Sequence, residues 1–121
     1  NFDVYGHLDY IARYIPANSY AYDWHDFDDL INTILKTIIE KGKGIEINTA
    51  GLKYGMPEPN PCLDIVKMYH NLRGEIITVG SDAHEVKYFA YRFDVVADML
   101  KNAGFNYYTI FNERKPEFIR L

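Results

Sequence analysis

The sequence predicts an α/β fold built on a parallel sheet. Short apolar or β-branched runs alternate with segments of helical apolar periodicity along the whole chain, and such alternation is typical of parallel sheets and barrels. Glycine-rich turns and His, Asp and Asn residues follow the predicted strands, which is the end that carries the chemistry in β/α barrels. The 121 residues, 48% of them hydrophobic, fit one small domain or part of a larger one.

Each predicted strand is a short apolar or β-branched run bounded by turn-forming residues. The predicted strands are residues 2–5, 45–48, 75–79, 107–111 and 116–120. Helical spacing or turn chemistry marks the segments between them. A short helix or turn is expected at 9–14, longer helices after Asp26, at 62–72 and at 88–103, and loops at 15–25 and 49–61.

The clearest amphipathic helix begins after Asp26, which is predicted to be its N-cap, with Asp28 and Asp29 in the first turn. Lys41-Gly42-Lys43-Gly44 supplies suitable chemistry for its C-terminus. The apolar positions recur at i, i+3, i+4 and i+7. They are Phe27, Leu30, Ile31, Ile34, Leu35, Ile38 and Ile39.

Composition excludes several classes of protein. The net charge is −4 and the pI is about 5.5, so no general attraction to nucleic acid or anionic membranes is expected. Apolar runs as long as a bilayer span do not occur in the sequence. The single cysteine, Cys62, cannot form an internal disulfide, which fits a reducing, cytoplasmic location. We expect Cys62 to fill space at a helix start.

The chemistry of the chain is concentrated after the strand that ends at Val79. Gly80 and Ser81 form a turn, and Asp82 and His84 follow two positions apart. Residues two apart in an extended segment point the same way, so a carboxylate and an imidazole can bind one divalent metal ion together. Asp-x-His is a short pattern, however, and on its own it is more often a loop carboxylate that caps a helix beside a solvated histidine.

Two further segments repeat this design. The segment 2–11 is a short strand ending in Gly6, followed at once by His7 and Asp9. The segment 44–52 is a strand with polar residues at its end. In it Glu46 alternates with isoleucines and so points opposite to them, either into a pocket or into a buried ion pair.

These segments, in this order, resemble the second half of the polymerase-and-histidinol-phosphatase (PHP) superfamily, and within it the histidinol-phosphate phosphatases. The resemblance covers nearly the whole chain and implies a distorted (β/α)7 barrel. The chain, residues 1–121, would be a single partial PHP domain forming the C-terminal half of this barrel. It lacks the opening His-x-His strand of the family, so we expect a C-terminal fragment of a longer protein. The matching pieces are Gly6-His7-Leu8-Asp9-Tyr10-Ile11, residues 44–52 and Gly80-Ser81-Asp82-Ala83-His84.

The resemblance implies that His7, Asp82 and His84 are catalytic metal ligands in a cluster of up to three divalent ions. Zinc, manganese and iron all suit mixed His and carboxylate sites, and the sequence does not choose among them. Clustered metals lower the pKa of a bound water and neutralise charge on a phosphoryl group. Without the resemblance, His7 alone is equally well explained as a buried, hydrogen-bonded histidine.

The substrate-binding candidates are Arg13, Lys53, Glu46 and Asn48. Arg13 and Lys53 are expected to hold the substrate phosphate, although Lys53 stands where the family often has an arginine with its bidentate fork. Both have the alternative role of a solvated surface charge. Asn48 and Thr49 either cap the strand end or contact substrate.

Asp9 and Ser81 are the predicted supporting residues. Asp9 either fixes the tautomer of His7 or caps residues 10–14. The two remaining histidines, His25 and His70, are interpreted as structural.

The function predicted first is a metal-dependent phosphatase that hydrolyses L-histidinol phosphate in histidine biosynthesis. One alternative is another PHP-type phosphoesterase or nuclease, against which the low basicity argues. The other is a non-catalytic half that needs a partner chain, the N-terminal half, or self-association. Because three ligands from one half rarely complete a multi-metal site, the chain alone is expected to bind metal weakly and to catalyse poorly.

Overall fold

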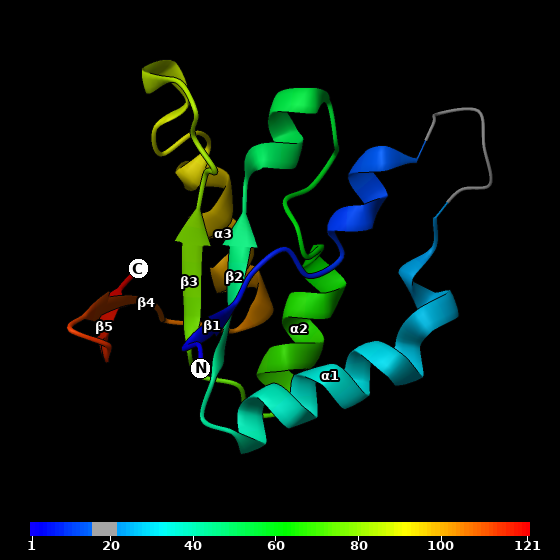
Figure 1. The fold of residues 1–121 in the computed structure, drawn as a ribbon, viewed down its shortest axis with the longest axis vertical. Helices are drawn as coiled ribbons and strands as arrows, with labels where there is room; N and C mark the ends of the chain where they lie inside the picture. Colours follow the sequence, from blue (N-terminus) through cyan, green and yellow to red (C-terminus); the bar gives the residue numbers. More distant parts are fainter. Residues whose placement is uncertain (16–21) are drawn as a thin grey trace.

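The computed structural model describes residues 1–15 and 22–121, which form a three-stranded parallel sheet, a two-stranded antiparallel hairpin and helices between them (Figure 1). The parallel sheet has the order β1 (Val4–Tyr5), β2 (Gly44–Asn48), β3 (Ile77–Gly80). The hairpin consists of β4 (Tyr107–Asn112) and β5 (Lys115–Arg120). The α-helices are α1 (Asp28–Glu40), α2 (Leu63–Asn71) and α3 (Phe93–Ala103).

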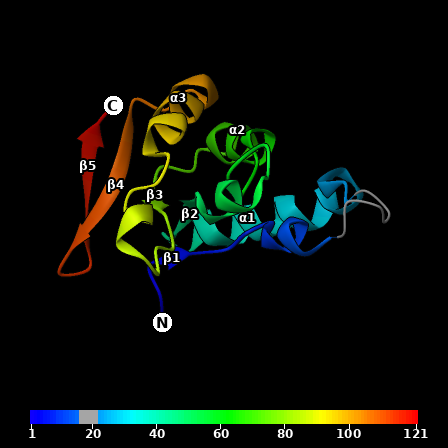
Figure 2. The ribbon, with the colours of Figure 1, turned by 90° about the horizontal axis from the view of Figure 1, so that it is seen from above.

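The three α-helices lie on one side of the parallel sheet (Figures 1 and 2). Paired residues of β2 and β3 face these helices. Ile45 lies opposite Ile77, and Ile47 lies opposite Val79. Ile45, Ile47 and Ile77 are fully buried. The period-two alternation therefore puts Glu46 on the other face of the sheet, as the sequence predicted.

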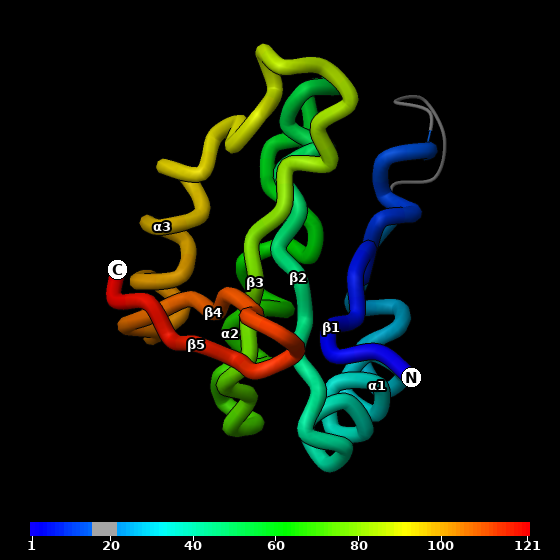
Figure 3. Tube along the Cα trace, turned by 60° about the vertical axis from the view of Figure 1, so that its left-hand side comes forward, coloured from blue at the N-terminus to red at the C-terminus, as the bar shows by residue number. Residues whose placement is uncertain are grey.

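The hairpin crosses beside β3 and forms a sheet of its own (Figure 3). The Thr109 hydroxyl of β4 accepts a hydrogen bond from the Ile77 amide at 3.2 Å. The two late strands are thus confirmed, but they pair only with each other and run antiparallel. The α/β class is confirmed by the three parallel strands, and closure into a (β/α)7 barrel stays a prediction.

Several predicted boundaries are corrected by the structure. Asp26 is not the N-cap of α1. It lies inside a 3-10 helix, Trp24–Phe27, whose start is capped by the Asp23 carboxylate accepting from the His25 amide. The helix predicted at 88–103 begins only at Phe93, because Ala90 and Arg92 adopt left-handed backbone angles that an α-helix cannot contain.

Other boundaries differ by less. The strand predicted at 2–5 pairs only over Val4–Tyr5, and the loop predicted at 49–61 contains a 3-10 helix, Ala50–Tyr54. Residues 9–14 form the expected short helix at Tyr10–Tyr14. The loop predicted at 15–25 lies partly outside the described residues. No helix among residues 1–15 and 22–121 is long and apolar enough to cross a membrane.

Candidate functional site

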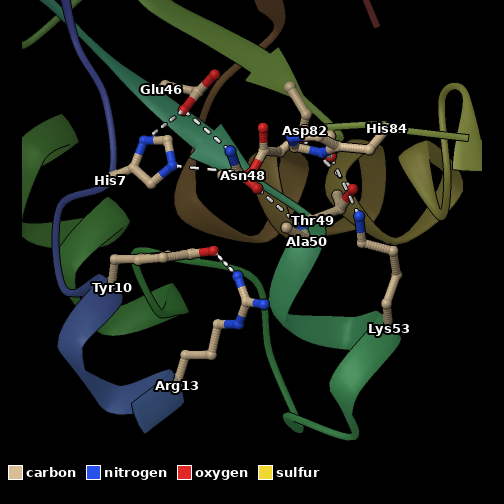
Figure 4. A network of polar contacts seen from close by, with 11 residues as sticks. His7, Tyr10, Arg13, Glu46, Asn48, Thr49, Ala50, Lys53, Asp82 and His84 are labelled. Carbon is tan, nitrogen blue, oxygen red and sulfur yellow. Dashed lines mark hydrogen bonds and ion pairs between the residues drawn. The ribbon is translucent and has the colours of Figure 1, made fainter.

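The candidate site lies at the carboxyl edge of the parallel sheet (Figure 4). His7 follows β1 by two residues, Asn48 ends β2, and Asp82 follows β3 by two residues. Parallel strands bring their carboxyl ends to one edge. Segments that are far apart in the sequence therefore meet here, as the three sequence motifs predicted.

His7 lies between two carboxylates. Its Nδ1 is 3.9 Å from Oε2 of Glu46, and its Nε2 is 4.0 Å from Oδ2 of Asp82. Both distances are too long for hydrogen bonds. All three side chains are partly exposed, at 49% for His7, 35% for Asp82 and 25% for Glu46.

The position of Glu46 is fixed by its neighbours. Oε2 accepts a hydrogen bond from the Asn48 amide at 3.2 Å, and Gly80 and Gly6 provide the space for the carboxylate because a Cβ at either position would approach it to 2.4 and 3.1 Å. Asn48 is buried, and its Oδ1 accepts from the Ala50 amide at 2.8 Å. Of the two roles predicted for Asn48, capping the strand end is the one seen in the structure.

The backbone is unusual at three of the predicted site residues. His7, Asp9 and Asp82 have φ angles of 59°, 63° and 47°. Side-chain-bearing residues rarely adopt this left-handed region, and such strain clusters at functional sites. The turns after β1 and β3 therefore hold His7 and Asp82 in strained backbone conformations.

The structure does not bring His84 into contact with His7. The Nδ1 atom of His84 lies 3.0 Å from the carbonyl oxygen of Asp82. A carbonyl oxygen can only accept, so Nδ1 must carry the proton, and Nε2 of the neutral ring then keeps its lone pair. His84 is exposed, and this tautomer leaves Nε2 available to a metal ion.

Two basic residues flank the site, each against aromatic rings. The Lys53 ammonium donates to the Asp82 carbonyl at 3.2 Å and lies 4.9 Å from the ring centre of Tyr88. The Arg13 guanidinium lies 3.9 Å from the ring centre of Tyr54 and donates to the Tyr10 hydroxyl. These contacts orient both cations, so neither is simply a solvated surface charge.

Known proteins that are similar to this chain are named histidinol-phosphatases. No family model matches the chain. The chain is 42% identical over 110 residues to a probable histidinol-phosphatase of Thermotoga maritima, covering 90% of this chain and 44% of that protein. A histidinol-phosphatase of Lactococcus lactis is 29% identical over 116 residues, covering 95% of this chain and 42% of that protein.

The crystal structure of histidinol phosphate phosphatase from Lactococcus lactis, complexed with zinc, L-histidinol and phosphate, matches the fold with a TM-score of 0.75. The match has 26% sequence identity and covers 97% of this chain and 44% of that chain. The chain is homologous to the histidinol-phosphatases. It spans less than half the length of the curated relatives it matches.

The three candidate metal ligands are only partly brought together in the structure. Imidazole nitrogen and carboxylate oxygen suit zinc and similar divalent ions, so the chemistry of His7, Asp82 and His84 fits. Within residues 1–15 and 22–121, however, His, Cys, Asp and Glu side chains form no group of three that could hold a metal ion. A complete centre would therefore need further donors or a movement of His84.

The predicted support of His7 by Asp9 is wrong. The Asp9 carboxyl interacts with the Tyr22 hydroxyl and the Cys62 amide, and burial raises its pKa despite these two contacts. Its side chain makes no capping hydrogen bond to the short helix that follows. Ser81, the other predicted supporting residue, is buried in the turn between β3 and Asp82.

Sequence reasoning missed two aromatic residues of the candidate site. Tyr10 packs edge-on against His7, with ring centres 4.6 Å apart, and its hydroxyl meets Arg13. Tyr54 lies under the same guanidinium. Tyr10 and Arg13 are three residues apart in a short helix, and this spacing could have predicted their contact. Nothing in the sequence indicated the contact between Tyr54 and Arg13.

Proposed function

We propose that this chain is part of a metal-dependent phosphatase that hydrolyses L-histidinol phosphate. In this proposal His7, Asp82 and His84 are metal ligands, and Arg13 and Lys53 hold the substrate phosphate. The observation that carries it is the approach of His7 and Asp82 to 4.0 Å at the ends of two different strands. Homology to histidinol-phosphatases over 90% of the chain supports the choice of substrate.

Zinc is the metal that the comparison favours, because the matching Lactococcus lactis structure contains it. Manganese and iron have compatible ligand chemistry, and the proposal allows up to three ions. When bound, such ions supply a nucleophilic hydroxide at neutral pH and neutralise charge on the phosphoryl group.

The residues of the chain would perform the remaining tasks. Glu46, fixed by Asn48, would orient the His7 ring through its Nδ1. Lys53 would present a point charge to the phosphate, and Arg13 a bidentate fork. Since the Asp82 carbonyl accepts from both Lys53 and His84, one loop would couple phosphate binding to the orientation of a metal ligand.

The proposal assigns this chain to the C-terminal half of a PHP barrel, residues 1–121 forming a partial domain. The 44% coverage of the Thermotoga relative supports the partial-domain part of this assignment. So does the set of exposed apolar side chains, which includes Val86 at 94% and Phe89 at 81% exposure. The missing donors would come from the other half of the barrel or from a second copy of the chain.

A second candidate is a non-catalytic half that becomes active only with a partner. The observation that favours it is the lack of a three-donor metal group among the described residues. A nucleic-acid substrate is disfavoured by the net charge of −4.

The test has two stages. Phosphate release from L-histidinol phosphate is first measured with the purified 121-residue chain plus zinc or manganese, where we expect little activity. The 110 residues of this chain that match the Thermotoga maritima protein then replace the corresponding segment of that protein. We expect this chimera to release phosphate, and its Asp82→Ala variant to lose about 100-fold or more, because even outer partners of metal ligands have effects of 10–100-fold. A well-folded but inactive chimera would refute the proposed function.

A further inference from the structure

A cavity of about 610 Å³ shares Arg13 and Tyr54 with the candidate site but is otherwise formed by different residues. Its size is typical of small-molecule sites. Three acidic residues line it, namely Asp9, Glu58 and Asp64. Among the described residues of its wall, Arg13 is the only basic side chain that opposes them. The cavity therefore favours a positively charged occupant.

Two hydrogen-bond acceptors in this wall are left without a donor. Asn60 is 1% exposed, and its amide nitrogen donates to the Asp9 carbonyl at 3.0 Å. The Asn60 Oδ1 and the Asp9 Oδ1 are inaccessible to solvent and have no hydrogen-bond partner among the described residues. Buried acceptors are rarely left unpaired, and the uncompensated lone pairs of these two oxygens add to the negative potential that the acidic residues create in the cavity.

The acidic groups keep most of their capacity to bind such an occupant. Glu58 accepts only a long hydrogen bond from the Leu63 amide, 3.4 Å, through one oxygen. Asp64 lies 3.8 Å from the Lys67 ammonium, an exposed pair. The hydrogen bond to Glu58 is long, the exposed Asp64–Lys67 ion pair is weak in water, and each carboxylate retains a second oxygen.

The aromatic side chains of the wall favour an organic cation over a metal ion as the occupant of the cavity. Tyr22 and Trp24 line the cavity, and aromatic faces attract ammonium and guanidinium groups. The acidic residues, by contrast, do not converge into any three-donor metal group within the described parts of the chain. The wall thus suits a flat or compact organic cation that donates hydrogen bonds.

We propose that this cavity binds the ammonium group of the substrate. Identification of that cation with L-histidinol rests on the proposed function, whereas the preference for an organic cation rests on the cavity wall. Arg13 separates the two regions, since it lines the cavity and also meets Tyr10, which packs on His7. The phosphate end then lies toward His7 and Lys53, and the cationic end beyond Arg13.

Trp24 makes the test direct, because it is the only tryptophan in the chain and lines the cavity. L-histidinol, which lacks the phosphate, is titrated into the 121-residue chain at pH 8 while Trp24 fluorescence is followed. The neutral comparison ligand is 4-(3-hydroxypropyl)imidazole, which lacks only the amine. The variants are Glu58→Gln and Asp64→Asn, with Asp98→Asn on the exposed side of α3 as a charge-matched control.

We expect saturable binding of L-histidinol that weakens about fivefold or more in each cavity variant, as for a lost charge-assisted contact, and is unchanged in Asp98→Asn. The neutral ligand should bind more weakly. An unchanged fluorescence signal, equal affinity for the neutral ligand, or equal loss in the control would overturn the proposal. An inactive chimera together with cation binding would refute only the proposed function. An active chimera without cation binding would refute only the cavity assignment.

Discussion

Gly80 at the end of β3 makes room for the carboxylate of Glu46 on β2. A Cβ at position 80 would lie 2.4 Å from Oε1 of Glu46, closer than any real Cβ contact. The register of the sheet explains this proximity, since Asn48 pairs with Gly80 and Glu46 with Thr78 on the same face. Gly80, two residues before Asp82, therefore provides the space in which the Glu46 carboxylate lies beside His7.

The substitution Gly80→Ala should displace Glu46 without unfolding the protein. Glu46 is long and partly exposed, so its carboxylate can move at a cost of less than about 1 kcal/mol in unfolding free energy. Gly44→Ala is the matched control, because its Cβ would lie 2.5 Å from the Ile76 carbonyl oxygen, which cannot move alone. That variant should lose about 1–3 kcal/mol.

Urea unfolding and the NMR signals of the His7 ring measure the two effects. Gly80→Ala should shift the His7 signals and leave the unfolding midpoint nearly unchanged. Gly44→Ala should lower the unfolding midpoint and leave the His7 signals nearly unchanged. Equal destabilisation by both substitutions would show that Glu46 is held rigidly.

Asp82→Asn should weaken zinc binding, since it removes the charge that faces Nε2 of His7 across 4.0 Å. The expected loss of zinc affinity is about 10-fold or more, because even the removal of a group that only supports a metal ligand costs about 10–100-fold. Isothermal titration with zinc measures it, and a chelator should return the protein to its starting state. Asp98→Asn removes the same charge from an exposed position on α3. Similar losses in both variants would mean that zinc responds only to net charge.

Lys53 should contribute to the binding of inorganic phosphate. Lys53→Met is expected to weaken phosphate affinity, and Lys53→Arg to retain or improve it, because a guanidinium can bind two phosphate oxygens at once. Lys36→Met, an exposed charge on α1, is the control and should have little effect. Competition by phosphate in the activity of the chimera provides the measurement. Equal inhibition of Lys53→Met and the parent chimera would exclude this role.

The sequence was sufficient to predict the elements that carry strong periodicity. Alternation of Ile45, Glu46 and Ile47 placed Glu46 opposite the core, and glycine-terminated strands placed His7 and Asp82 at one edge. Both results follow from local geometry, because side chains alternate along a strand and parallel strands end together.

Features that depend on distant contacts could not be predicted. Asp9 lies two residues from His7, but its carboxyl is turned toward Tyr22 and Cys62. Both residues have left-handed backbone angles, which the alternation of an extended segment does not predict. The cap of the segment before α1 was also ambiguous locally. Asp23 and Asp26 are both suitable acids, and in the structure Asp23 is the cap of Trp24–Phe27.

Asp3 and Arg114 make stability depend on pH. Arg114, in the turn between β4 and β5, donates to both carboxylate oxygens of Asp3 at 2.8 and 3.0 Å. This pair, with Lys43 nearby, holds the pKa of Asp3 below its ordinary value. A depressed pKa stabilises the fold above the unfolded pKa of ~3.9, and that contribution disappears as the pH falls through the folded value.

The pH dependence is measured by urea unfolding of the wild type and of Asp3→Asn. The wild type should be the more stable protein at pH 6–7, and the difference should shrink on acidification below about pH 4. Arg114→Met should remove most of the same difference, because it removes the main partner. A stability difference that persists at pH 2 would show that Asp3 acts through packing rather than charge.

Cys62 should resist thiol reagents in the folded protein. It stands at the N-cap of α2, where burial raises the pKa of its thiol to about 11. At pH 8 about 0.1% of such a thiol is ionised, against roughly a quarter of an ordinary one with a pKa near 8.5. Reaction with Ellman's reagent should therefore be about two orders of magnitude slower than in guanidinium-unfolded protein. Cys62→Ser should give no signal in either state, and rapid reaction of the native wild type would show that the start of α2 opens to solvent.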